Sequence, residues 1–334
     1  MTVVRALLSL LVALSYTSAS ASQQDAGGPP VNPQLLSFHE RFATPTLKKV
    51  SERVYAAFAF EYSNFTFIEG DEGVIVVDTG WYRGGLTRAL AEFRKISNKP
   101  VVALMYTHSH TDHTGASEVL LAEAGESPIE VYAPSNWQHY LDYSLSPLRP
   151  MVIRRAFGQM GMVLPRGESG TVGAGVGPNP GMDGEPGLVI PTVEVDQRTA
   201  ITIAGIKLEL LPAAGVIPEH MMVWLPEERV LMSGDLLGGT FPYVESARYE
   251  PDRDPAAMVS SLDLALSLKP QSVIPGHGRL LIGPADVTEN LVLNRDLIQY
   301  LVDQVDRLVI QGLIADQLVE SCRLTKVFCE HPPL

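Results

Sequence analysis

Four residues that can bind metal stand within six positions of one another, directly after an apolar run. The run covers residues 100–106 (PVVALMY), and the four residues are His108, His110, Asp112 and His113. Residues two apart in an extended chain share a face, so His108 and His110 can point at one ion. Asp112 would then cap a following helix, while His113 in its first turn would face a second ion. Imidazole and carboxylate ligands together suit zinc, and also iron or manganese.

Three further candidate ligands each stand where a strand is expected to begin or end: His220, Asp235 and His277. Taken singly, they could be a surface residue after a turn, a helix cap and a loop residue. Their order after the first cluster favours metal binding instead. The remaining histidines lack such settings, and we expect them to be surface or packing residues: His39, His139 and His331.

Strands and helices alternate along the chain, which lets these residues meet at the edge of a sheet. Period-two or continuous apolar patterns predict strands at 54–60, 64–69, 73–78, 100–106, 193–212, 221–234 and 272–275. Helical patterns cover 84–96, 116–124, 255–268 and 287–313. Residues 166–187 are rich in glycine, but no strand precedes them and no helix follows. We therefore expect a long loop there, not a phosphate-binding turn.

The composition is that of a globular, acidic protein. Hydrophobic residues make up 46%, charged residues 19%, and the formal net charge is −13. Such a surface repels phosphate backbones and the chain has no basic run, so nucleic acid is not expected as a partner. A small anionic substrate stays possible, because bound metals and one or two arginines reverse the field locally.

Residues 1–21 have the pattern of a secretory signal. Arg5 precedes the apolar stretch 6–16, and Ala19 to Ala21 offer small residues for cleavage. We expect a periplasmic or secreted protein without stable membrane insertion, since the apolar stretch is shorter than the roughly 20 residues of a span. Cys322 and Cys329 could form a disulfide after export or remain two free thiols.

The order His-x-His-x-Asp-His, His, Asp, His resembles the metallo-β-lactamase superfamily. The resemblance implies an α/β fold, the αβ/βα four-layer sandwich, with a dinuclear site at one edge. It assigns one metal to His108, His110 and His220, the other to Asp112, His113 and His277, and a bridging role to Asp235. It also makes Asp78 a supporting residue at the end of an early strand. We therefore expect the chain to be organised as a signal peptide (1–21), an N-terminal arm (22–48), a catalytic domain (49–285) and a C-terminal helical segment (286–334).

A narrower resemblance is to the alkylsulfatase branch of that superfamily. The resemblance is seen in residues 154–161 (RRAFGQMG), 164–167 (LPRG) and 294–304 (NRDLIQYLVDQ). It also includes Arg248, five residues before Arg253. The chain departs from that branch, which has Glu at the positions of His220 and Asp235 and a His-rich stretch before the arginine.

The resemblance implies hydrolysis of alkyl sulfate esters by a hydroxide bridging two Zn²⁺ ions, with Fe or Mn not excluded. Asp112 would orient the nucleophile and Arg248 would bind the sulfate of a small anionic substrate with an apolar chain. The alternative on the same fold is hydrolysis of a β-lactam, lactone, thioester or phosphodiester. An iron-dependent oxidoreductase and a non-catalytic metal-binding module are the competing classes. We expect a monomer or a weak dimer.

Overall fold

The computed structural model describes residues 31–126, 128–144, 183–238 and 254–314, and 150, 154, 164, 172, 173, 177, 178 and 317. Several expectations concern residues outside that set. They are the signal segment 1–21, most of the glycine-rich stretch 166–187, Arg248, and the pair Cys322 and Cys329.

Seven strands form the first sheet in their chain order: β1 (Thr46–Lys49), β2 (Val54–Phe58), β3 (Phe65–Glu69), β4 (Val74–Val77), β5 (Val101–Met105), β6 (Glu130–Pro134) and β7 (Val193–Val195). The first four strands make an antiparallel meander. From β4 onward each neighbour is parallel. Parallel strands share an edge at their carboxyl ends, which is where ligands of such sheets usually bind.

Six strands form the second sheet in the order β13-β12-β11-β10-β9-β8. They are β8 (Thr199–Ile203), β9 (Ile206–Pro212), β10 (Met221–Leu225), β11 (Val230–Gly234), β12 (Ser272–Pro275) and β13 (Leu281–Ile282). β10 and β11 form an antiparallel hairpin, with Leu225 opposite Val230. β11 and β12 run parallel, joined through α7 (Pro255–Ser267).

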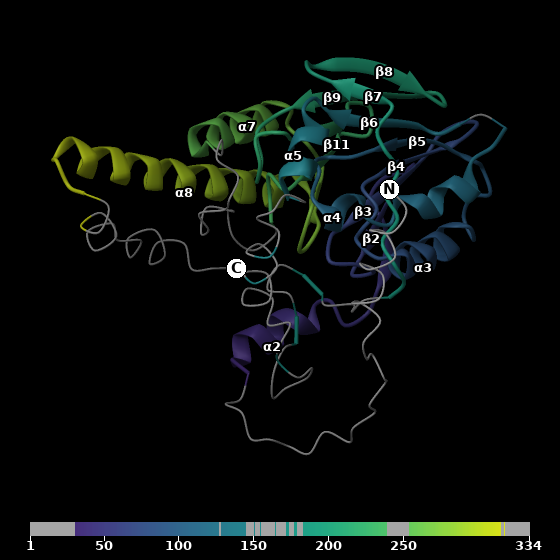
Figure 1. Ribbon diagram of the computed structural model, residues 1–334, viewed down its shortest axis with the longest axis horizontal. Coiled ribbons are helices and arrows are strands. Elements are labelled where there is room, and N and C mark those ends of the chain that lie inside the picture. Colours follow the sequence, from purple (N-terminus) through teal and green to yellow (C-terminus); the bar gives the residue numbers. More distant parts are fainter. Residues whose placement is uncertain are drawn as a thin grey trace, which may run out of the picture.

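Helices cover the outer face of each sheet, and three apolar clusters separate the layers. One cluster lies between the sheets, a second between the first sheet and α3 (Arg83–Phe93), and a third between the second sheet, α7 and α8 (Pro284–Ile310). Alternation along β2 sends Ala56 into the first cluster and Tyr55 into the second. Figure 1 shows α7 and α8 on one side of the strands and α3 on the other. The expected αβ/βα four-layer sandwich is confirmed.

The described part of the segment 22–48, expected as an N-terminal arm, contains a helix and a strand. Residues 33–40 form α2 (Pro33–Glu40), which begins with an Asn32 side chain capping the Gln34 amide. β1 then pairs with β2 as an edge strand, so the first sheet begins before residue 49. Between them Phe42 is buried, with its ring 5.3 Å from that of Phe58. Burial of that ring ties the segment to the sandwich.

Two expected helix boundaries also differ. The helix expected at 116–124 is a 3₁₀ helix (Ser117–Glu123) after the single turn α4 (Thr111–Thr114). α4 ends at Gly115, where a Cβ would lie 2.6 Å from the carbonyl oxygens of Thr111 and Trp81. α8 begins at Pro284, before the expected boundary at 286. Gly283, with φ 93°, is its N-cap, and a proline is well suited to the first position of a helix.

Strands β6 and β13 and helix α5 (Trp137–Ser144) lie outside the predicted set, as α2 and β1 do. Among the described helices, none combines the length and apolar character needed to cross a bilayer.

Candidate metal centre

The first half-site consists of His108, His110 and His220. The chain leaves β5 at Met105 and crosses the sheet edge, where Nε2 of His108 lies 2.9 Å from Nδ1 of His110. His220 stands just before β10 and forms an isolated antiparallel bridge with His108. Its ring centroid lies 5.5 Å from that of His108. The two sheets therefore contribute to one histidine cluster.

The second half-site consists of Asp112, His113 and His277. Asp112 and His113 belong to α4, and His277 follows β12. Nε2 of His277 lies 3.2 Å from Oδ2 of Asp112 and 3.3 Å from Nε2 of His113. The three ligand atoms lie within 4.8 Å of one another.

Asp235 lies between the two half-sites. Its Oδ1 is 3.3 Å from Nε2 of His113 and 3.5 Å from Nε2 of His277, whereas its Oδ2 is 3.7 Å from Nε2 of His108. The side chain is nearly buried, with 3% of its surface exposed. One carboxylate thus faces both clusters with different oxygens, as a bridging ligand does.

These side chains fit a divalent cation. Ring nitrogens facing each other at 2.9 and 3.3 Å repel unless a proton or a cation lies between them. At His220, Nδ1 lies 2.8 Å from the Ala213 carbonyl oxygen, which makes Nε2 the lone-pair nitrogen. That Nε2 is buried and has no hydrogen-bond partner among the described residues. A buried acceptor of this kind is satisfied by a metal ion.

Asp78 orients one of the ligands from the end of β4. Its Oδ2 lies 2.8 Å from Nδ1 of His113, and both its oxygens accept hydrogen bonds from Thr107, one from the amide and one from the hydroxyl. A carboxylate on Nδ1 keeps the proton there, so Nε2 of His113 faces the cluster as a lone pair. The position of Asp78 agrees with the supporting role that the resemblance implies.

The two half-sites differ in electrostatics. Burial lowers the pKa of His220 to about 4, and burial together with His113 and His110 lowers that of His108 well below its usual value. Burial also opposes charge on His277, but Asp235 and Asp112 outweigh it and raise the pKa to about 9. Burial likewise opposes charge on Asp112 and Asp235, but His113 and His277 outweigh it and hold the pKa of both carboxyls low. A cation entering the second half-site therefore displaces protons.

Comparison with known proteins identifies the family. Residues 59–277, more than half of the chain, match the metallo-beta-lactamase superfamily. The chain belongs to that superfamily. It is 33% identical over 271 residues to a linear primary-alkylsulfatase of a Pseudomonas strain, covering 80% of this chain and 51% of that protein. It is 27% identical to an alkyl/aryl-sulfatase of Saccharomyces cerevisiae, covering 88% and 47%.

A solved structure gives the same picture. The stereoselective inverting sec-alkylsulfatase from Pseudomonas sp. matches with a TM-score of 0.72 and 26% identity, over 85% of this chain and 46% of that one. The chain thus spans about half the length of the relatives it matches.

The structure brings six of the seven candidate ligands into two groups of ligand atoms, and the seventh, His220, lies beside the first group with its ring 5.5 Å from that of His108. The structure differs on one detail: His110, not Asp112, is the N-cap of α4, and Asp112 lies inside the turn. His139 is exposed on α5 and His39 lies on α2, apart from the cluster. Arg248 lies outside the described residues.

Sequence reasoning missed three buried polar residues that contact the segments carrying the candidate ligands: Asn64, Ser109 and Glu219. These polar residues are buried, yet nothing in their local pattern distinguishes them from turn residues. Burial is a property of the folded chain, and only the structure supplies it.

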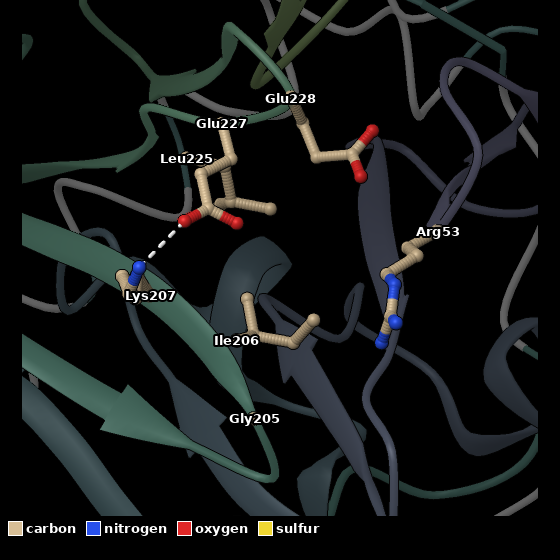
Figure 2. A pocket seen from close by; sticks show the side chains of 7 residues that line it. All are labelled: Arg53, Gly205, Ile206, Lys207, Leu225, Glu227 and Glu228. Atoms are coloured by element: carbon tan, nitrogen blue, oxygen red, sulfur yellow. Dashed lines mark hydrogen bonds and ion pairs between the residues drawn. The ribbon is translucent and has the colours of Figure 1, made fainter.

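A hollow of about 80 Å³ lies at the opposite edge of the sandwich, among turns of both sheets (Figure 2). Its two cations are already paired, Lys207 with Glu227 at 2.8 Å and Arg53 with Asp71 at 2.7 Å. This hollow therefore does not present a free cationic site to an anionic substrate.

Proposed function

We propose that the protein is a metal-dependent hydrolase of alkyl sulfate esters. The observation that carries the proposal is Asp235, which faces both half-sites at one edge of the sandwich. The alkylsulfatase relatives match over 80% and 88% of this chain and support the substrate class.

Divalent ions in the two half-sites, zinc in our proposal, would supply a water of lowered pKa and stabilise negative charge as the ester bond breaks. The first half-site would hold one ion and the second half-site the other, with Asp235 shared. Asp78 keeps His113 in the tautomer that a metal needs. The hydrogen bond from His113 to Asp78 thus fixes the orientation of this candidate ligand before substrate enters.

Asp112 has the further role of orienting the nucleophile. Its side chain is 21% exposed, whereas those of Asp235 and His277 are only 3% and 4% exposed. The pKa of Asp112 is low because the nearby His113 and His277 outweigh burial, so its carboxylate stays ionised at neutral pH. An ionised, partly accessible carboxylate can accept a hydrogen bond from an attacking water and later carry a proton toward the leaving group.

Arg248 is our proposed sulfate-binding residue. A planar guanidinium can donate to two non-bridging oxygens of a sulfate at once. Arg248→Ala should lower kcat/KM for alkyl sulfates by about a hundredfold, the loss of one buried charge-assisted contact at ~2–3 kcal/mol. Metal content and any activity on an uncharged lactone should stay unchanged. Equal loss on both substrates, or none on either, would exclude sulfate recognition by Arg248.

A substrate panel tests the proposed function directly. Dodecyl sulfate, nitrophenyl sulfate, a phosphodiester, a lactone and a cephalosporin are assayed on one preparation whose metal content is measured. We expect about two equivalents of metal per chain and turnover of dodecyl sulfate. Turnover confined to a lactone, the cephalosporin or the phosphodiester would replace our substrate class with the alternative on the same fold.

Two variants test the site itself. His110→Ala should lose metal together with activity, because a ligand is removed. His139→Ala should lose neither, because this exposed histidine lies on α5, away from the cluster. A fully active His110→Ala protein would overturn the ligand assignment.

We also propose export of the mature chain and a monomer or weak dimer in solution. Apolar side chains near the end of α8 are exposed, with Val309 at 51% and Ile310 at 85%, which supports weak self-association. Sedimentation at micromolar concentration tests this, and a dimer that does not dissociate on dilution would contradict it.

A further inference from the structure

We propose that each half-site has its own positioning residue outside the ligand set: Asn64 for the second half-site and Glu219 for the first. The inference rests on the proposed metal binding. Neither residue is itself within the ligand clusters, and each contacts the backbone or side chain of a residue next to a ligand. Loss of one should therefore weaken one half-site and spare the other.

Asn64 binds the turn that carries His277. Its side-chain amide donates to the carbonyl oxygens of Pro275 and Gly278, at 2.9 and 3.0 Å. Its backbone amide donates to the carbonyl oxygen of Gly276 at 2.7 Å. These three hydrogen bonds bracket His277 on both sides. Asn64 is 6% exposed, so water competes little for them.

The neighbours of Asn64 extend this contact to the rest of the second half-site. Nδ1 of His277 lies 2.9 Å from the Tyr62 carbonyl oxygen, which places the proton on Nδ1 and directs Nε2 to the cluster. The Ser63 hydroxyl donates to the Asp112 carbonyl oxygen. Two ligands from different parts of the chain are thus held by one short segment, residues 62–64, which Asn64 fastens to the turn after β12.

Glu219 performs the equivalent task for the first half-site. Its carboxyl is buried beneath Ser109, the residue between His108 and His110, and accepts hydrogen bonds from the Ser109 hydroxyl at 3.1 Å and from the Ser109 amide. Side chains alternate in extended chain, so a contact on Ser109 lies opposite the two histidines. Fixing Ser109 therefore fixes the direction in which both neighbours point.

The backbone around Glu219 shows what this contact joins. The Met221 amide donates to the Thr107 carbonyl oxygen at 2.8 Å, and His108 and His220 form a bridge. The Glu219–Ser109 contact is the side-chain part of this junction between the two sheets. A buried carboxyl costs free energy, and Oε1 of Glu219 has no hydrogen-bond partner among the described residues. A positioning role accounts for its presence there.

Zinc affinity in two half-site backgrounds tests the proposal. In His110→Ala only the second half-site is complete, and in His277→Ala only the first. Dissociation constants for Zn²⁺ are measured by competition with a chromophoric chelator. Asn64→Asp keeps the size of the side chain but removes the amide donor, so it should weaken binding about 10–100-fold in the first background. In the second background it should change binding less than about threefold.

Glu219→Ala should show the opposite pattern, with its loss confined to the His277→Ala background. Glu219→Gln keeps an oxygen that accepts from Ser109, so it should restore most of the affinity. Asn64→Ser, which keeps one donor, should give an intermediate loss. Thermal unfolding of the metal-free proteins, prepared with a chelator, checks that each variant folds. If Asn64→Asp does not fold, Asn64→Ser takes its place.

The outcomes separate the inference from the proposed function. Failure of the unmodified protein to bind zinc would refute the metal centre itself. Binding by the unmodified protein with equal losses in both backgrounds, or with no loss in either, would refute the assignment of Asn64 and Glu219 and leave the metal centre standing.

Discussion

Glu61 makes the stability of this protein depend on pH in a predictable way. The residue is fully buried, and one carboxyl oxygen accepts weak hydrogen bonds from the amides of Trp81 and Tyr82 at 3.4 and 3.3 Å, just before α3. Its side chain packs against Gly80 and Gly85, where a Cβ would lie 2.5 Å or less from it. Burial raises the pKa of Glu61 to about 7, although those amides and Arg88 partly oppose the shift.

The magnitude follows from linkage. The unfolded chain ionises Glu61 near pH 4.5, whereas the folded chain holds the proton until about pH 7. The stabilisation is therefore fully present below pH ~4.5 and is lost as the pH rises through about 7. At ~1.36 kcal/mol per pKa unit, the loss between pH 5 and pH 8 is roughly 2–3 kcal/mol.

The assay measures the free energy of unfolding in urea at several pH values, for Glu61→Gln and for the unmodified chain. Both proteins are first made metal-free with a chelator. Gln cannot ionise, so the unmodified chain should lose about 2–3 kcal/mol relative to the variant from pH 5 to pH 8. Glu194→Gln, at an exposed position on β7, is the matched control and should follow the unmodified chain. A difference between Glu61→Gln and the unmodified chain that stays constant across this range would refute the reasoning.

Two further predictions concern the metal centre. Asp78→Asn should lower zinc affinity about 10–100-fold, because the amide no longer fixes the proton on Nδ1 of His113, and unchanged affinity by chelator competition would contradict that role. Because nearby carboxylates raise the pKa of His277 to about 9, zinc must displace its proton below that pH, so affinity should fall as the pH falls. Calorimetry in two buffers of different ionisation enthalpy measures the released protons, and an identical heat in both would contradict the prediction.

The sequence points to the candidate ligands because their chemistry is local in the chain. His108, His110, Asp112 and His113 directly follow the apolar strand β5, and a strand end is a recognisable place for a ligand. The supporting contacts have no such local pattern. Asn64 meets the Pro275 carbonyl across 211 positions of sequence, so only the docking of the two sheets reveals it.

The same distinction explains the errors in the predicted elements. The segment before residue 49 has few apolar residues, but the burial of Phe42 and the pairing of β1 with β2 fix it to the first sheet. The helical pattern over 116–124 corresponds to a 3₁₀ helix over Ser117–Glu123, which follows the closely packed Gly115. In each case tertiary contacts outweigh a weak local preference.

The sharing of the centre between two sheets has a mechanical consequence. His113 and His277 lie 164 positions apart in the chain, yet their ring nitrogens are 3.3 Å apart. An ion held by both would cross-link the sheets and close a very long loop of the unfolded polypeptide, which restricts that polypeptide far more than it restricts the native fold. Removing the ion would then loosen the seam between the two halves of the sandwich first, so proteolysis and amide exchange should begin there.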